Sequence, residues 1–372
     1  MYKKIWMGLA ATIILVAIVT TTLFVARANG ANAKSSGGDG IGQPEYWTPA
    51  QNGMVANVLA RGKGHPASAV PYWSSSFTYK GTTYPYTMIG TNPAAGSATT
   101  TIQPIIVPIS FTFSNGVTLD GSKRVQPALA SPIFQNAPFV SGNTQYGDAI
   151  QRAEFWNSVS TTSPDYHVLL GKSTVLPTVS INVPKQSGQE TTGQASGAPL
   201  GLVDINYVYP KVRAMISLMP LSATALPIFL TYNTFFYQGS TANCCILGYH
   251  DAVASLTSNQ LNTYMVAAYS DLGIFSQPIA DIHALSHELS EWMNDPFINN
   301  KVPNWTVPSA AQYGCSNSLE TGDPLVGVAF DVNGYHPQDE ALLAWFARQA
   351  PSPSYQGRYT YLGTFTTFSP SC

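Results

Sequence analysis

An amphipathic stretch from Gln277 to Asn294 constrains the fold of this chain more than any other segment. At about 100° of rotation per residue, a helix over this stretch divides into two faces. The apolar face consists of Ile279, Ile282, Leu285, Leu289, Trp292 and Met293. The ionisable side chains of the central turns gather on the other face, and they are His283, His287, Glu288 and Glu291. The pattern therefore predicts a helix that packs through one face and collects imidazoles and carboxylates on the other.

Both ends of this helix are predicted from local sequence signals. Ser276 suits an N-terminal cap, and Pro278 suits the first helical turn, where its missing N–H is not needed. The helix should end at Asn294, because the Asp295-Pro296 pair that follows disfavours helical backbone before the proline.

Two choices of metal ligands fit the ionisable face. In the first, His283 and His287 form the pair four residues apart, and the residue after the first histidine is Ala284, which offers no base. In the second, His287 and Glu291 are the ligands and Glu288 is placed to accept a proton, as in zinc hydrolases. One ion does not readily reach all three of His283, His287 and Glu291, because eight residues span about 12 Å of helix axis. We adopt the second choice, which keeps His283 as a further candidate ligand, a neighbour of the ligands or a substrate contact.

A solvated polar face is the alternative interpretation of this helix. Charged residues make up only 10% of the chain, so four ionisable groups within the nine positions from His283 to Glu291 are an unusual concentration. That concentration favours a site.

A third ligand is expected downstream of the helix. Glu320 lies at a separation typical of zinc enzymes whose third ligand is a later glutamate, and Asp323 is a fallback ligand or a partner of the ligands. Asp323 also suits a simple Gly-Asp-Pro turn. His250, at the end of a predicted strand, is another possible ligand.

Tyr335 and His336 are candidates to donate a hydrogen bond to a developing oxyanion, although a surface turn explains them equally well.

The C-terminal third of the chain, from Cys244 to Cys372, resembles the zincin-like metallopeptidases and more particularly the secreted EXORDIUM (phosphate-induced protein) family. The matching pieces are Ser286-His287-Glu288-Leu289-Ser290-Glu291, Asn294-Asp295-Pro296, Glu320-Thr321-Gly322-Asp323, Cys245 with Gly248-Tyr249-His250, and Cys372. This resemblance implies a secreted protein in which His287, Glu291 and Glu320 bind Zn²⁺ or another divalent ion and Glu288 is the base. If the protein is a peptidase, the resemblance implies a peptide or protein substrate. Because the family is associated with the extracellular matrix, the alternative is a non-catalytic matrix or binding protein whose metal site is structural or vestigial.

The N-terminus has the layout of an export signal. Lys3 and Lys4 precede an uncharged apolar run from Ile5 to Ala26. Cleavage after Ala28 or Ala33 would release a secreted or extracellular protein. The run is also long enough to span a bilayer, so an uncleaved signal anchor is the alternative, and membrane attachment is expected only in that case.

The remaining sequence predicts an α+β protein. After the signal or anchor of residues 1–33, residues 34–60 form a flexible linker and residues 61–235 are rich in strand patterns. Residues 236–372 form a zincin-like region with the metal-binding helix, packed against the β-rich part, and 257–272 is predicted to be another helix. The formal net charge of −2 and the lack of a basic run exclude nucleic acid as an expected partner.

Four cysteines, Cys244, Cys245, Cys315 and Cys372, are expected to form disulfides in an exported protein. Three pairings are possible. A bond between the adjacent Cys244 and Cys245 is geometrically strained, so we expect two longer loops, with one of this pair bonded to Cys315.

Overall fold

The structure, a computed structural model, describes residues 70–193, 195–256, 261–306, 315–368 and 372. The described chain combines helices with a larger share of strands, so the predicted α+β class is confirmed. The predicted signal or anchor and the predicted linker lie outside the described residues. Within those residues, no helix is both long enough and apolar enough to cross a bilayer.

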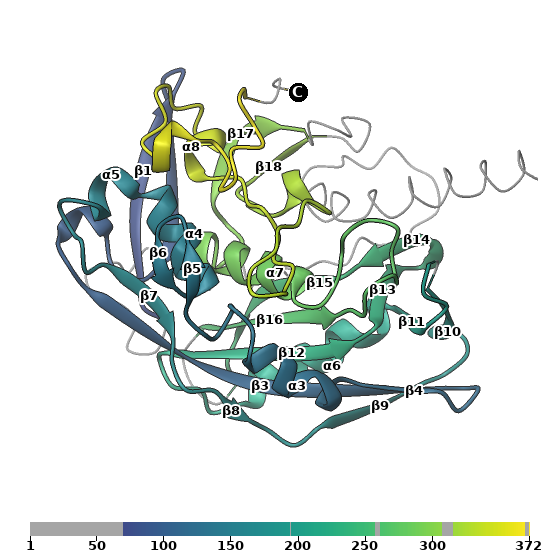
Figure 1. The fold of residues 1–372 in the computed structure, drawn as a ribbon. Helices are drawn as coiled ribbons and strands as arrows, with labels where there is room; N and C mark the ends of the chain where they lie inside the picture. The colour runs from purple at the N-terminus through teal and green to yellow at the C-terminus, as the bar shows by residue number, and fades with distance from the viewer. Residues whose placement is uncertain (1–69, 194, 257–260, 307–314, 369–371) are drawn as a thin grey trace, which may run out of the picture.

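A mixed sheet forms the centre of the molecule, with the strand order β15-β16-β12-β3-β4 (Figure 1). Its strands are β3 (Thr99–Phe113), β4 (Thr118–Asp120), β12 (Ala225–Tyr232), β15 (Gly248–Ala254) and β16 (Leu261–Tyr269). The long strand β3 also pairs with β7 (His167–Leu170), β8 (Thr174–Val175) and β9 (Val179–Val183). Strand β12 runs parallel to both β3 and β16, whereas β15 is antiparallel to β16. Isoleucine, valine and threonine dominate β3, and their branched side chains pack well on a pleated surface.

Two helices cover opposite faces of β16 (Figure 1). Helix α7 (His283–Asn294) contributes Leu289 to a core that includes Met265 of the strand. Helix α6 (Ile205–Leu218) lies in a second core, which includes the neighbouring strand residue Tyr264. Because successive side chains of a strand point to opposite faces, the sheet is buried on both sides here. The polar face of α7 is therefore held against the sheet and its loops.

Smaller elements surround this centre. A second sheet has the strand order β10-β11-β13-β14, and three two-stranded sheets, β1-β2, β5-β6 and β17-β18, complete the strands that the structure describes. The bounds of the second sheet are Gly188–Thr192, Pro199–Asp204, Thr234–Gln238 and Ser240–Ile246 in that order. The bounds of the two-stranded sheets are Tyr72–Tyr79, Thr82–Ile89, Ala137–Phe139, Gly142–Thr144, Lys301–Trp305 and Ser316–Ser318. The remaining helices are α3 (Val125–Leu129), α4 (Tyr146–Glu154), α5 (Trp156–Val159) and α8 (Leu343–Phe346).

The predicted division of the chain at residue 235 falls inside strand β13. Strands β12 and β11, which precede this point, pair with β16 and β13. The β-rich part and the part that carries α7 therefore share their sheets.

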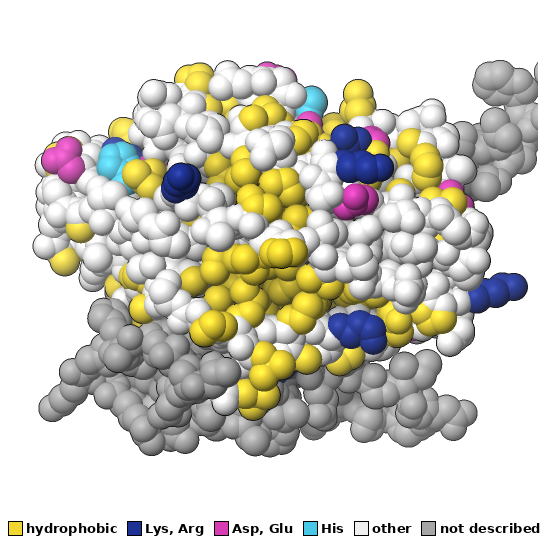
Figure 2. Space-filling view, turned by 90° about the horizontal axis from the view of Figure 1, so that it is seen from below, with side chains coloured by type: hydrophobic (Ala, Val, Ile, Leu, Met, Phe, Trp, Pro, Cys, Tyr) yellow, Lys and Arg dark blue, Asp and Glu magenta, His cyan; other side chains and the backbone are white. Residues whose placement is uncertain are grey.

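The sparse charge of the chain is visible on its surface. The face seen from below, where β8 and β9 lie, carries a broad patch of hydrophobic side chains with few charged groups among them (Figure 2).

Two predicted helix assignments differ from the structure. The segment 257–272 contains strand β16, and its prediction as a helix was wrong, because an apolar run this short has no periodicity that separates strand from helix. Helix α7 ends at Asn294 as expected but begins at His283, six residues later than predicted. The preceding backbone makes a bridge between Ser270 and Asp281, and Asp281 has a φ of 41°, which is incompatible with a continuous helix.

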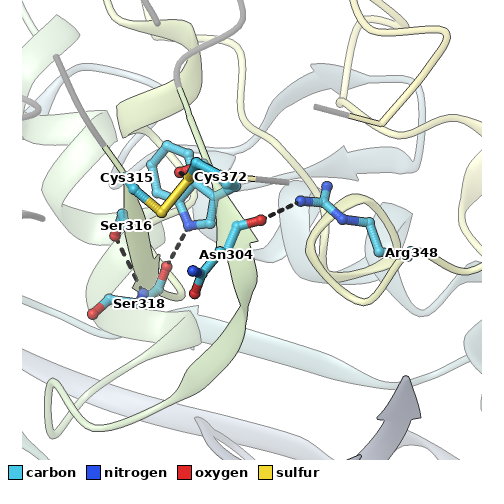
Figure 3. The surroundings of a disulfide bond; sticks show 7 residues. Asn304, Cys315, Ser316, Ser318, Arg348 and Cys372 are labelled. Atoms are coloured by element: carbon cyan, nitrogen blue, oxygen red, sulfur yellow. Dashed lines mark hydrogen bonds between the residues drawn. A yellow bond between two sulfur atoms is a disulfide. The ribbon is translucent and has the colours of Figure 1, made fainter. Parts of the chain in front are cut away.

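The disulfides also differ from the prediction. Cys244 bonds to Cys245, and Cys315 bonds to Cys372, so the expected bond between the adjacent pair and Cys315 was wrong. The Cys244–Cys245 peptide bond is cis, and the two Cα atoms lie 3.0 Å apart, which brings the neighbouring sulfurs within bonding reach. The second disulfide joins the start of β18 to the C-terminal residue beside Asn304 and Arg348 (Figure 3).

We expect the Cys315–Cys372 disulfide to stabilise the folded chain. Its sequence separation of 57 residues means that the bond removes considerable loop entropy from the unfolded state. Replacing both cysteines by serine should lower the free energy of unfolding by about 2–4 kcal/mol, measured as the shift of the urea midpoint. An unchanged midpoint would contradict this role.

A buried carboxyl joins α4 to α8. Glu154 is 2% exposed, and its side chain accepts a hydrogen bond from the backbone N–H of Leu343, the first residue of α8. Burial raises the pKa of Glu154 to about 8 against the opposing effect of this hydrogen bond. The folded chain therefore holds the Glu154 proton more tightly than the unfolded chain does.

The Glu154→Gln variant should become more stable relative to the wild type as the pH rises. The stability that protonated Glu154 contributes is fully present below its ordinary pKa of 4.5 and is lost as the pH rises through about 8. Glutamine keeps the acceptor for Leu343 but cannot ionise. Urea unfolding at several pH values across this window measures the difference. The Glu190→Gln variant on β10 is the matched control for the loss of a glutamate. A flat profile for Glu154→Gln would refute the assignment.

Candidate metal centre

The polar face of α7 lies inside the protein. His287 and Glu288 are each 1% exposed and Glu291 is 2% exposed. They meet two residues from other elements, His250 on β15 and Asp323 in the loop after β18, which are 1% and 5% exposed. Imidazoles and carboxylates therefore converge here from the helix, the sheet and a loop.

Five side chains form two groups of three that share Glu291. The first group is His287, Glu291 and Asp323, and the second is His250, Glu288 and Glu291. In each group, the candidate ligand atoms lie within 4.8 Å of one another. The donor types, imidazole nitrogen with carboxylate oxygen, are those that bind Zn²⁺ and other divalent first-row ions. Both groups therefore fit a metal ion by their chemistry.

The first group combines a helical turn with a loop. His287 Nε2 lies 3.2 Å from Glu291 Oε1, its neighbour four residues along the helix, and 3.7 Å from Asp323 Oδ1. The backbone N–H of Gly322 donates to Glu291 Oε1 at 3.3 Å. A Cβ at position 322 would collide with the His287 ring, so glycine is needed for this close approach.

Gln338 determines which nitrogen of His287 faces the carboxylates. Its Oε1 lies 3.2 Å from His287 Nδ1, and its Nε2 donates to the carbonyl oxygen of Gly322 at 2.7 Å. The backbone N–H of Gln338 also donates to Ser286 Oγ at 2.9 Å. Because the amide oxygen accepts, Nδ1 carries a hydrogen and Nε2 is directed at Glu291 and Asp323.

The electrostatics of the site reflect this crowding of carboxylates. Burial opposes a charged imidazole at His287, but Glu291, Glu288 and Asp323 outweigh it and raise the pKa of His287 well above its ordinary value. Burial raises the pKa of the nearby Glu340 well above its usual range, against the opposing charge of His287. The carboxylates of the site therefore stabilise positive charge close to Glu291.

The other predicted site residues lie outside both groups. Glu320 is half-buried, and Asp323 takes the position beside His287 that Glu320 was expected to hold. Burial lowers the pKa of His283 to about 3, and its Nε2 accepts from the backbone N–H of Gly327 at 3.4 Å.

The predicted oxyanion residues have partners in other segments. The Tyr335 hydroxyl donates to the carbonyl oxygen of Pro127 at 3.0 Å. His336 Nδ1 lies 2.6 Å from Asp281 Oδ2, and its backbone N–H donates to the same carboxylate. Gln338, two residues further on, contacts the site and was not predicted, because no motif around it indicates that role.

We expect Gln338→Leu to weaken metal binding. Loss of the amide leaves His287 Nδ1 without its acceptor and frees the ring to turn, which typically costs 10–100-fold in affinity (about 1.4–2.7 kcal/mol). Calorimetric titration of the metal-stripped protein with Zn²⁺ measures the change. Gln126→Leu, on the exposed side of α3, should bind as the wild type does. Equal affinities for wild type and Gln338→Leu would remove Gln338 from the site.

No family model, curated protein or solved structure matches the chain. The interpretation of this centre therefore depends on its own geometry.

Proposed function

We propose that this protein is a divalent-metal-dependent hydrolase that acts on peptide bonds, with His287, Glu291 and Asp323 as metal ligands and Glu288 as the general base. The observation that supports the proposal is the convergence of one imidazole and two carboxylates beside a further carboxylate on the same helix. Asp323 replaces Glu320 in the ligand set expected from the sequence. The ligand types suit Zn²⁺, and the two carboxylates also suit Mn²⁺.

Each residue has a separate task in this proposal. A divalent ion supplies Lewis acidity, which polarises a substrate carbonyl and makes a water more acidic. Glu288 follows His287 directly on α7 and accepts the proton of the attacking water. Gln338 holds the His287 ring in the ligating orientation, and Gly322 lets the loop approach closely enough to place Asp323.

A secreted protein is part of the proposal. The N-terminal sequence has the layout of an export signal, and the two disulfides of the described chain are typical of proteins outside the cytoplasm. Substrates would accordingly be extracellular peptides or proteins.

A second candidate is a non-catalytic extracellular matrix or binding protein with a structural metal site. The observation that favours it is burial, since none of the five side chains is more than 5% exposed. Structural metal sites are closed, whereas catalytic sites keep a position for water or substrate. The two candidates therefore differ in whether the bound metal reaches solvent and substrate.

The Glu288→Gln variant tests the hydrolase. We expect it to lose about 10²–10⁴-fold in kcat/KM on a quenched fluorescent peptide library, because the base contributes by proton transfer. Its metal content, measured by mass spectrometry, should still include the ion held by His287.

The matched control is Glu190→Gln on β10, which should retain full activity. If metal-loaded wild type cleaves no peptide and still binds metal stoichiometrically, the structural candidate replaces the hydrolase.

A further inference from the structure

The second group of ligating side chains has the same construction as the first. His250 Nδ1 lies 3.5 Å from Glu288 Oε2 and 3.6 Å from Glu291 Oε2. Glu291 directs its other oxygen, Oε1, toward His287. One carboxylate therefore stands between two imidazoles, with one oxygen facing each.

The orientation of the His250 ring is determined from outside the group. Its Nε2 lies 3.2 Å from the backbone carbonyl oxygen of Asp295, which can only accept a hydrogen bond. Nε2 therefore carries a hydrogen and donates. Nδ1 therefore faces the carboxylate oxygens of Glu288 and Glu291, an arrangement that suits a cation between them.

The distances around His250 Nδ1 distinguish between a proton and a metal ion as that cation. A charge-assisted hydrogen bond between imidazolium and carboxylate has a length of about 2.7–2.9 Å. Ligand atoms held about 2.1 Å from one tetrahedral metal ion lie about 3.4 Å from each other. The separations of 3.5 and 3.6 Å around His250 Nδ1 match the second value.

The burial of the carboxylates points the same way. Three carboxylates, those of Glu288, Glu291 and Asp323, share the site with two imidazoles and are at most 5% exposed. Buried carboxylates are costly unless cations or hydrogen bonds compensate them, and Glu288 and Glu291 both face His250.

We propose that the centre binds two divalent cations bridged by Glu291, with the second cation held by His250, Glu288 and Glu291. This inference rests on the proposed function for the first ion, held by His287, Glu291 and Asp323. Two-metal hydrolytic sites place their ions about 3.5–4 Å apart, a spacing that a carboxylate with one oxygen on each ion can span. The ligand class is a first-row divalent ion such as Mn²⁺ or Zn²⁺.

The role of Glu288 is extended by this arrangement. Its Oε2 faces His250 and becomes a ligand of the second cation, whereas Oε1 lies on the side of Gly248, where a Cβ would collide with it. Gly248 thus gives the Glu288 carboxylate the space to lie against the sheet. The loss of Glu288 should consequently affect the second cation as well as proton transfer.

Metal stoichiometry tests the proposal directly. The purified full chain is stripped of metal, loaded with MnCl₂ and dialysed, and its Mn²⁺ content is measured by plasma mass spectrometry together with its electron paramagnetic resonance spectrum. We expect two Mn²⁺ per chain and a spectrum with exchange coupling between them. His250→Gln should bind one Mn²⁺ per chain and lose the coupling, while His283→Gln, a buried control on α7 outside both groups, should keep two.

The outcomes separate this proposal from the proposed function. One Mn²⁺ per chain in the wild type, retained in His250→Gln and lost in His287→Gln, overturns the second cation and leaves the hydrolase centre intact. An absence of bound Mn²⁺ and Zn²⁺ in the wild type overturns both. The wild-type stoichiometry and coupling decide the matter even if His250→Gln fails to fold.

Discussion

The site depends on the contacts of one buried group, the carboxylate of Glu291. It lies between His287 and His250 and accepts a hydrogen bond from Gly322, so it contacts the helix, the sheet and the loop at once. A carboxylate in this environment is costly unless positive charge and hydrogen bonds compensate it. The elements around Glu291 therefore have to approach closely, and small residues occur where they do. Gly322 lies against the His287 ring and Gly248 lies against Glu288.

The fold supplies the rigidity that such a site requires. Helix α7 rests on β16 through its apolar side chains, and α6 fills the opposite face of the same strand. The antiparallel pairing of β15 with β16 sets His250 opposite Met265, so the register of the sheet decides which side chain of β15 faces α7. A shift of one residue would turn His250 to the other face and remove it from the site.

Local patterns predicted part of this arrangement, and non-local packing decided the rest. The spacing of His287, Glu288 and Glu291 needs only helical periodicity, and the end of α7 at Asn294 follows from the proline two residues later. The start of α7 depends instead on the bridge of Asp281 to Ser270, a contact that no local pattern contains.

The distant chain also determines which acidic residue joins His287. Glu320 and Asp323 are three residues apart, and the close approach of Gly322 selects Asp323. His250, which the sequence offered as a possible ligand, reaches the site through the sheet register. Gln338 reaches it through a loop contact and has no sequence signal of its own.

Solvent access to the centre depends on the loop side of the site. Asp323 is the most exposed of the five side chains, at 5%, and the other four are exposed by no more than 2%. A cation bound as we propose would therefore exchange with solvent past Asp323, which follows β18. The same part of the chain is tied down by Gln338, by the hydrogen bond between Ser290 and Thr321, and, at the start of β18, by the Cys315–Cys372 disulfide. The constraints that stabilise the loop consequently also limit how readily the centre opens. A buried, restrained site would strengthen the electrostatic attraction between the carboxylates and the proposed cation, at the expense of the cation's rate of exchange.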